Sequence, residues 1–284
     1  MTAKFGCQLP QHDSNINRIF EVANDCERLG YDSVWVYDHL APYWLRSQSS
    51  LEAWSLLSAV AARTSTIRVG SLVTNVLLRN ASLLAKITST VDNLSEGRLI
   101  VGLGIGDRRS LSELRSYGYK FPPLKDRLTL LRETITVLRS MWTEREVSYG
   151  GKMVKLSHAV CQPKPRQEPG PPIWIGGKHH MLLHVIGELA DGWNHWGLSK
   201  EKLRELEAYL DSKCAEFHRP AGSVTESWAG PIRFEHTDGR NEVDKIREKL
   251  ESIGGKTSYF IASFPSNADH KTYEAFAEAV KSLA

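Results

Sequence analysis

The sequence predicts a (β/α)₈ barrel, and three observations lead to this fold class. Short apolar segments rich in β-branched residues alternate with longer segments of helical periodicity, and eight such pairs can be followed along the chain. Strict alternation is typical of a parallel sheet whose strands are joined by right-handed crossovers. The chain has 284 residues, and a barrel of this kind needs about 250. An open doubly wound sheet is the alternative, but eight units in one series favour closure.

Each element has its own signal in the sequence. The first helix, for example, carries Ile16, Ile19, Ala23 and Cys26 on one face and ends before Gly30. The predicted strands are residues 4–9, 33–37, 67–73, 98–103, 172–175, 192–196, 227–234 and 258–264. The predicted helices are residues 14–29, 51–62, 81–94, 126–142, 180–189, 200–217, 242–253 and 270–283. Residues 1–284 are therefore predicted to form one barrel domain.

One stretch interrupts the alternation, at residues 143–171. A hairpin is predicted at 147–156 around Gly150 and Gly151, and a proline-rich loop follows at 162–172. This stretch is predicted to be an insertion of hairpin and loop into the barrel.

Composition narrows the class of protein. The chain is 41% hydrophobic and 24% charged, with a formal charge of +3, so a globular protein is indicated and a nucleic-acid partner is not. Neither a signal-peptide pattern nor an apolar run of about 18 residues is present. The four cysteines are widely separated and form no CxxC pair. We therefore expect a cytoplasmic protein with reduced thiols that acts on a small molecule, without a membrane.

Candidate site residues are those that follow each strand, because active sites of such barrels lie at the carboxyl ends of the strands. These positions are rich in glycine and polar groups. They are Gln8, Asp38, His39, Thr74, Asn75, Gly104 to Asp107, Gly176, Gly177, Lys178, Asn194, His195 and Pro265.

Several of these positions allow two interpretations. His39 could transfer a proton near neutral pH or could be held by a helix cap. Gly104 and Gly106 could admit a planar ring to the backbone or could serve close packing. Residues 107–109, an aspartate and two arginines, form either a solvated loop or an anion-binding rim. Gly176, Gly177 and Lys178 precede a helix and could bind phosphate, although a generic strand-to-helix turn looks similar.

Two other chemistries find little support in the sequence. His180 and His184 have the spacing of metal ligands on a helix, but a third ligand is not evident, so no metal is predicted. No serine has the setting of a nucleophile elbow, which disfavours acyl transfer.

Several motifs together resemble the luciferase-like monooxygenase superfamily. The segments that carry the resemblance are residues 36–39, 51–54, 67–75, 92–98, 102–107, 172–177 and 190–193. Within the superfamily the chain is similar to the branch that uses the deazaflavin coenzyme F-420 (F420). It most resembles the methylenetetrahydromethanopterin reductases, through residues 104–108, 117–118 and 263–265. Its likeness to the F420-dependent glucose-6-phosphate dehydrogenases is weaker around Tyr43 and Trp44.

The resemblance implies a set of site residues. Asp38 and His39 would flank the deazaflavin ring, with Gly104, Gly106 and Asp107 on its other side. Ser71, Leu72 and Thr74 would form a bulge against the ring, with a non-proline cis peptide at Ser71–Leu72 or within one residue of it. Gly176, Gly177 and Lys178 would hold the phosphate. His39 and Asp107 are the candidates for proton handling.

The substrate side is less defined. Its candidates are Gln8, Tyr43, Trp44, Trp54 and Trp196, and for each aromatic residue core packing is the alternative. The reductases carry a carboxylate at the position of Gln8, and an amide cannot donate a proton in the same way. The chain is also shorter around residues 235–240. Both departures put a pterin substrate in doubt.

The predicted function is hydride transfer between coenzyme F420 and an organic substrate. One alternative is an FMN-dependent monooxygenase fed by a separate flavin reductase, and another is a flavin-binding protein without catalysis. Cations at Arg108, Arg109 and Lys178 favour F420, because it carries an acidic oligoglutamate tail. The resemblance also implies a homodimer.

Overall fold

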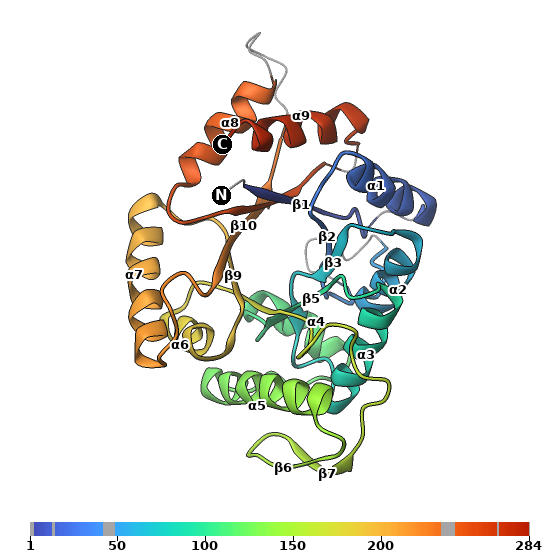
Figure 1. Cartoon of the computed structure of the whole chain (residues 1–284), viewed down its shortest axis with the longest axis vertical. Coiled ribbons are helices and arrows are strands. Elements are labelled where there is room, and N and C mark those ends of the chain that lie inside the picture. Colours follow the sequence, from blue (N-terminus) through green and yellow to red (C-terminus); the bar gives the residue numbers. More distant parts are fainter. Residues whose placement is uncertain (1–2, 13–14, 42–48, 234–241, 266, 284) are drawn as a thin grey trace. The chain divides into compact units, whose positions relative to one another are not determined.

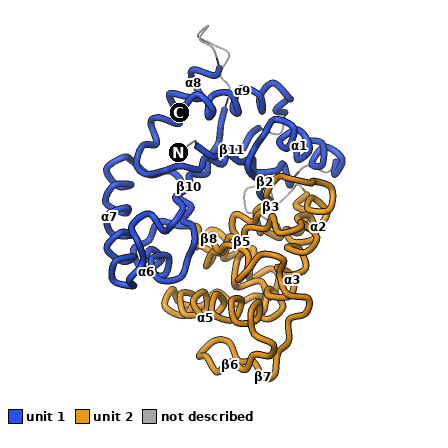
Figure 2. Tube along the Cα trace, in the orientation of Figure 1, with its two compact units in different colours: residues 1–35, 177–284 blue, residues 36–176 orange. Residues whose placement is uncertain are grey.

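The computed structural model describes residues 3–12, 15–41, 49–233, 242–265 and 267–283. The chain divides into two compact units, which Figure 2 colours separately. One unit comprises residues 1–35 and 177–284, and the other comprises residues 36–176. The chain passes from one unit to the other at the last residue of a strand, Val36, and directly after another strand, at Gly177.

The first unit contains a parallel sheet with the strand order β2-β1-β11-β10-β9. Its strands are β1 (Lys4–Gln8), β2 (Ser33–Val36), β9 (Gly192–His195), β10 (Thr225–Pro231) and β11 (Tyr259–Ser263). Its helices are α1 (Ile16–Arg28), α6 (His180–Leu189), α7 (Lys200–Glu216), α8 (Glu242–Ile253) and α9 (His270–Lys281). Aromatic side chains join sheet and helices: the Phe5 ring lies 4.7 Å from that of Tyr31 and 6.3 Å from that of Phe276.

The second unit is built around β5, which pairs in parallel with β3, β4 and β8. Its strands are β3 (Arg68–Ser71), β4 (Thr74–Asn75), β5 (Leu99–Gly104) and β8 (Ile173–Gly176), with an antiparallel hairpin of β6 (Val147–Gly150) and β7 (Lys155–Ala159). Its helices are α2 (Ala53–Arg63), α3 (Ala81–Leu94), the short 3-10 helix η1 (Arg108–Ser110), α4 (Leu111–Ser116) and α5 (Leu124–Thr143). Helix α3 packs against both α2 and α5 (Figure 1). All six residues of β5 are buried, as expected of a central parallel strand.

Strand and helix alternate along the described chain as the sequence predicts, with β3 and β4 together in the place of the third strand. That strand is divided by a cis peptide bond between Leu72 and Val73, which lies within the predicted window. The hairpin also lies in the predicted insertion.

Two helical segments were not predicted from the sequence. Residues 108–116 form η1 and α4, where the sequence analysis predicts no helix. The Asp107 side chain caps the start of this segment. The segment is short and charged, so it has no apolar periodicity from which a helix could be predicted. None of the helices in the described residues is both long and apolar enough to cross a membrane.

Candidate active site

Three segments that follow strands lie side by side in the second unit. The amide of Leu72 donates a hydrogen bond of 2.7 Å to the carbonyl of Val36, and the amide of Asn75 donates one of 3.0 Å to the carboxylate of Asp38. Asn75 is in turn the partner of Gly104 in the pairing of β4 with β5. The strand ends that carry Asp38, Leu72 and Gly104 therefore share one edge of this unit.

Glycines on β5 and β8 make room for the bulge between β3 and β4. A Cβ atom on Gly102 would lie 1.9 Å from the carbonyl oxygen of Ser71, and one on Gly104 would lie 2.5 Å from the Val73 side chain. A Cβ atom on Gly176 would lie 2.9 Å from the same valine. The bulge therefore sinks against β5 and β8 at positions that only glycine permits.

Side-chain hydrogen bonds fix the same bulge from within. The Ser71 hydroxyl donates to the carbonyl of Gly102 at 3.0 Å, and the Thr74 hydroxyl donates to Ser71 Oγ at 2.8 Å. Both residues are fully buried. The structure thus gives these two predicted cofactor contacts a structural task, which is to hold the backbone of the bulge.

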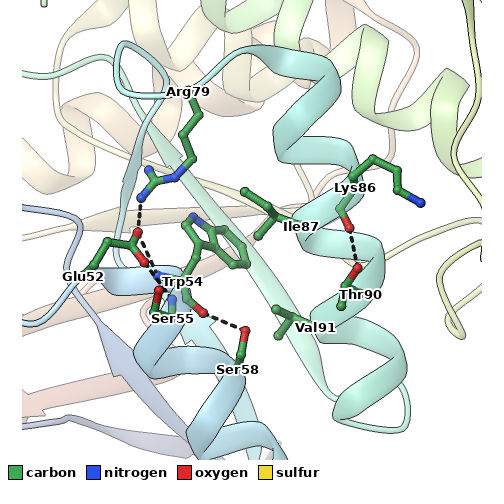
Figure 3. Close-up of a pocket in the computed structure, with 9 residues that line it drawn as sticks. All are labelled: Glu52, Trp54, Ser55, Ser58, Arg79, Lys86, Ile87, Thr90 and Val91. Carbon is green, nitrogen blue, oxygen red and sulfur yellow. Dashed lines mark hydrogen bonds and ion pairs between the residues drawn. The ribbon is translucent and has the colours of Figure 1, made fainter.

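Asp38 is a buried acid whose carboxylate is bound by neighbouring groups of the protein. Arg79 binds it with both terminal nitrogens, at 2.6 and 3.0 Å, and also forms an ion pair with Glu52 (Figure 3). Burial raises the pKa of Asp38, and the hydrogen bonds and charge of Arg79 act in the opposite direction. Such a bidentate pair fixes geometry, so Asp38 anchors the segment that carries His39.

His39 forms a dyad with Glu113 of α4. The Nδ1 atom of His39 lies 2.7 Å from Oε2 of Glu113, whose side chain is only 4% exposed. The other carboxylate oxygen accepts the amides of Leu40 and Ala41. Burial raises the pKa of Glu113, but the hydrogen bonds and charge of His39 and the two amides outweigh it, so the pKa lies below its usual value. Glu113 is therefore an acceptor-only carboxylate at neutral pH.

Asp107 caps the helical turn that follows β5. Its Oδ1 accepts the amides of Arg109 and Ser110, at 2.9 and 3.0 Å, and the Ser110 hydroxyl at 3.1 Å. The residue is exposed, as are Arg108 and Arg109. The structure thus gives Asp107 a capping role beside the proton-handling role that the sequence suggested.

Arg127 of α5 holds the loop before that turn. Its guanidinium donates to the carbonyls of Ile105 and Gly106, at 3.0 and 2.6 Å, and packs 4.1 Å from the ring centroid of Phe121. Gly106 has a φ of +65°, a conformation that favours glycine. The loop Ile105–Gly106 is therefore held by a buried cation instead of being left to solvent.

Four of the remaining candidates belong to the first unit: Gln8, Gly177, Lys178 and Trp196. The Gly177 amide donates to the carbonyl of Asn194 at 3.0 Å, so it is already engaged. The Lys178 ammonium lies 5.2 Å from the ring centroid of Trp196, which is 52% exposed. Gln8 is the last residue of β1 and is half-buried.

Trp54 lines a groove between α2 and α3. The groove has a volume of about 470 Å³ and its lining residues appear in Figure 3: Glu52, Trp54, Ser55, Ser58, Arg79, Lys86, Ile87, Thr90 and Val91. The indole of Trp54 is 3% exposed and packs between the two helices. Tyr43 and Trp44, the other predicted substrate walls, lie outside the described residues.

Sequence reasoning missed three residues that organise the site: Arg79, Glu113 and Arg127. Each lies within or next to a helix, whereas the sequence prediction considered residues directly after strands. No sequence signal marked Glu113, because its burial and the helix that carries it are seen only in the structure.

The two histidines at metal spacing have other neighbours. His180 Nε2 lies 3.2 Å from Glu205, and the ring of His184 packs edge-on against Phe217. No group of three or more metal-binding side chains gathers anywhere in the described ranges.

Comparisons with known proteins add a family and a fold. The model of the luciferase-like monooxygenase family matches residues 1–278. The chain is 33% identical over 178 residues to an F420-dependent glucose-6-phosphate dehydrogenase of Amycolatopsis mediterranei, covering 62% of this chain and 52% of that one. It is 28% identical over 188 residues to a 5,10-methylenetetrahydromethanopterin reductase of Methanolobus tindarius, covering 66% and 52%. The matched segments thus span about half the length of these relatives.

A solved structure resembles the whole chain. It is an F420-dependent secondary alcohol dehydrogenase in complex with an F420-acetone adduct, with a TM-score of 0.86 at 17% identity over 99% of each chain. At this identity, the similarity is evidence for the fold alone. It confirms the predicted (β/α)₈-barrel class.

Proposed function

Because the chain belongs to the luciferase-like monooxygenase family, we propose that it is an oxidoreductase that transfers a hydride between coenzyme F420 and an organic substrate. The observation that carries this proposal is the His39–Glu113 dyad, which lies in the same unit as the glycine-lined bulge. Relatives named as F420-dependent dehydrogenases and as a methylenetetrahydromethanopterin reductase support the choice of coenzyme.

The residues at the edge of the second unit suit a planar ring. At the bulge around Leu72–Val73, the main chain would contact the ring. Glycine at positions 102, 104 and 176 lets this bulge pack closely against β5 and β8. When bound, the deazaflavin supplies the hydride chemistry. His39, Leu72, Gly104 and Gly106 are the residues that would hold the ring, with Asp107 beside them, and Asp38 would fix the segment that carries His39. Lys178 and the first turn of α6 are the candidates for the phosphate, since cations and helix N-termini favour anions.

We infer further that the reacting carbon of the substrate carries a hydroxyl or carbonyl oxygen. Hydride removal from such a carbon must be matched by transfer of the hydroxyl proton, which a histidine can accept near neutral pH. Gln8 stands where the pterin reductases have a carboxylate. An amide at this position favours an alcohol or ketone as the substrate over a methylene pterin.

We also propose that the protein is a homodimer. The family resemblance suggests it, and helix α3 leaves Leu83 and Leu94 exposed. Large exposed apolar side chains on one helix are common at protein interfaces. Light scattering on the purified protein measures the mass directly.

The experiment that tests the proposed function separates the coenzymes. Purified protein is titrated with F420 and, separately, with FMN, and binding is followed by fluorescence. The protein with bound coenzyme is then offered secondary alcohols and glucose 6-phosphate, and reduction of F420 is followed by absorbance. We expect tighter binding of F420 and turnover with at least one hydroxyl compound. Tighter binding of FMN with oxygen consumption would assign a monooxygenase, and binding without turnover would assign a flavin-binding protein.

A further inference from the structure

We propose that Glu113 is the positioning residue of the site, because it sets which ring nitrogen of His39 carries a proton at rest. The proposal rests on the function proposed above in one respect, the use of His39 for proton transfer. Glu113 lies on α4, a helix absent from the sequence prediction. Its contacts with residues 39–41 join this helix to the segment that follows β2.

Glu113 holds a proton on Nδ1 of His39. The carboxylate oxygen of Glu113 lies 2.7 Å from Nδ1 and is part of a side chain that is 4% exposed. An ionised carboxylate can only accept hydrogen bonds, so Nδ1 must be the donor. In the neutral imidazole the proton therefore stays on Nδ1, and Nε2 is the basic nitrogen.

Glu113 also fixes the orientation of the ring. The same carboxylate accepts the main-chain amides of Leu40 and Ala41 through its other oxygen. The ring and the backbone on its carboxyl-terminal side are thus fixed by one side chain. Asp38 fixes the backbone on the other side through Arg79 and the amide of Asn75. His39 is therefore held from both sides, so its ring cannot turn without leaving a buried carboxylate without its partner.

This arrangement serves the proton transfer that accompanies hydride transfer. During oxidation of an alcohol, the hydride and both electrons of the carbon–hydrogen bond would leave the substrate, and the deazaflavin, when bound, would supply the acceptor for them. The hydroxyl hydrogen passes as a proton to Nε2 of His39, and the carbon–oxygen bond of the product becomes double. His39 is then a cation next to the anionic Glu113, which stabilises it. The proton leaves Nε2 for water, and reduction of a carbonyl compound runs the same steps in reverse.

The variant Glu113→Gln tests the proposal because its effect on the ring is specific. Oε1 of Glu113 meets two amide donors, so the carbonyl oxygen of glutamine would remain on them. Its NH₂ group would then face Nδ1, and an amide nitrogen can only donate. The neutral ring would have to move its proton to Nε2. Nitrogen-15 chemical shifts of the His39 ring, read in the full-length protein without coenzyme, report this tautomer directly.

A matched control is available in the same unit. Glu133 is also a buried glutamate, and it accepts the amides of Lys152, Met153 and Val154 without a histidine. We expect Glu133→Gln to leave the His39 shifts and the turnover rate unchanged. In Glu113→Gln we expect the Nε2-protonated tautomer and turnover that is slower by about 100-fold or more, since general-base catalysis contributes about 10² to 10⁴. The KM should stay within about threefold of the parent protein.

The outcomes are separable. Unchanged His39 shifts in Glu113→Gln overturn the proposal. A switched tautomer with unchanged turnover overturns the catalytic use of that tautomer. If the parent protein shows no turnover at all, the proposed function fails, while the chemical shifts still decide whether Glu113 sets the His39 tautomer.

Discussion

At the scale of single residues, the three acids of the site have different tasks. Asp38 is tied to Arg79 and anchors backbone, whereas Asp107 caps a helical turn. Glu113 meets the histidine. The sequence drew attention to the two aspartates because they follow strands, but the acid that pairs with His39 comes from a helix. Position directly after a strand therefore did not identify the acid that pairs with the His39 imidazole.

Glu207 and Glu226 form a buried acidic cluster in the first unit, and the proposed reaction does not use them. Glu226 of β10 accepts the Thr257 hydroxyl at 2.7 Å and lies 3.4 Å from Nε2 of His195. Glu207 of α7 accepts the amide of Lys256 at 2.5 Å and also interacts with Glu226. Burial raises the pKa of Glu207, and the negative charge of Glu226 adds to the effect.

This cluster predicts a pH dependence of stability for Glu207→Gln. An acid whose folded pKa is raised keeps its proton in the folded state while the unfolded chain releases one. Stability of the parent protein should therefore fall as pH rises above the usual glutamate value, and the fall ends at the raised pKa. Glutamine has no proton to lose, so the variant should gain stability over the parent across this window, by up to about 1.4 kcal/mol for each unit of the shift. Below the usual value the gain should vanish.

Urea unfolding at several pH values measures this difference. The control is Glu205→Gln, an exposed acid on the same helix whose pKa is lowered by Lys202. It should show no gain at neutral pH. A difference between Glu207→Gln and the parent that is constant with pH would contradict the prediction.

At the scale of elements, the broken strand β3–β4 lies at the edge that carries the candidate site residues Asp38, Leu72 and Gly104. Its two parts pair with different ends of β5, and the intervening residues rise out of the ladder. The interruption is matched by Gly102 and Gly104 on β5, whose missing side chains leave the space that Ser71 and Val73 occupy. The glycines that looked like a ring-binding surface thus serve close packing first.

The variant Gly102→Ala should therefore damage the second unit. Its Cβ atom would lie 1.9 Å from a main-chain oxygen, which cannot move aside as a flexible side chain can. Overpacking of this kind costs about 1–3 kcal/mol, and occasionally more. We expect the free energy of unfolding, measured in urea, to fall by that amount. Gly150→Ala is the matched control, because nothing lies within 4 Å of its Cβ position. Equal stabilities for the two variants would show that the bulge does not depend on Gly102.

The sequence predicted the regular strands and helices better than the break in the third strand and the additional helix α4. Alternation and apolar periodicity located the eight strand–helix pairs, because each depends on local side-chain pattern. The position of the cis bond could be expected only from family resemblance, since it results from packing against β5. Helix α4 was missed because its six residues are too few for a period to show. Contacts such as Glu113 to His39 join residues 74 positions apart, and no local pattern encodes them.

One motif of the family resemblance has a structural role. Residues 92–98 comprise the end of α3 and the turn that leads to β5, in which Glu96 and Gly97 have φ of 54° and 85°. Arg98 then donates hydrogen bonds to the carbonyls of Ala61, Thr64 and Ile67. This segment ties α2, α3 and β5 together at the amino-terminal end of the strand. Its part in the resemblance therefore reflects the fold and not the chemistry.

At the scale of the whole molecule, the choice between the two candidate coenzymes depends on the distribution of charge. Both F420 and FMN carry a phosphate, so the first turn of α6 does not discriminate between them. Discrimination must come from charge that meets the acidic tail of F420. Arg108 and Arg109 are exposed on η1 and supply two such charges.

The double variant Arg108→Ala/Arg109→Ala should therefore reduce the preference for F420 over FMN. Exposed ion pairs contribute about 0–1 kcal/mol each, so two arginines account for up to about 2 kcal/mol, or roughly 30-fold in Kd. Because screening acts over about 8 Å at 0.15 M salt, the preference of the parent protein should also shrink as salt rises, and the variant should depend less on salt. Titration of each protein with both coenzymes, at low and at high salt, gives the four dissociation constants that are compared. The variant Arg145→Ala/Lys155→Ala removes the same charge from the β6–β7 region, where both residues are exposed, and should keep the preference. Equal losses in the two variants would mean that net charge, and not the position of Arg108 and Arg109, attracts the coenzyme.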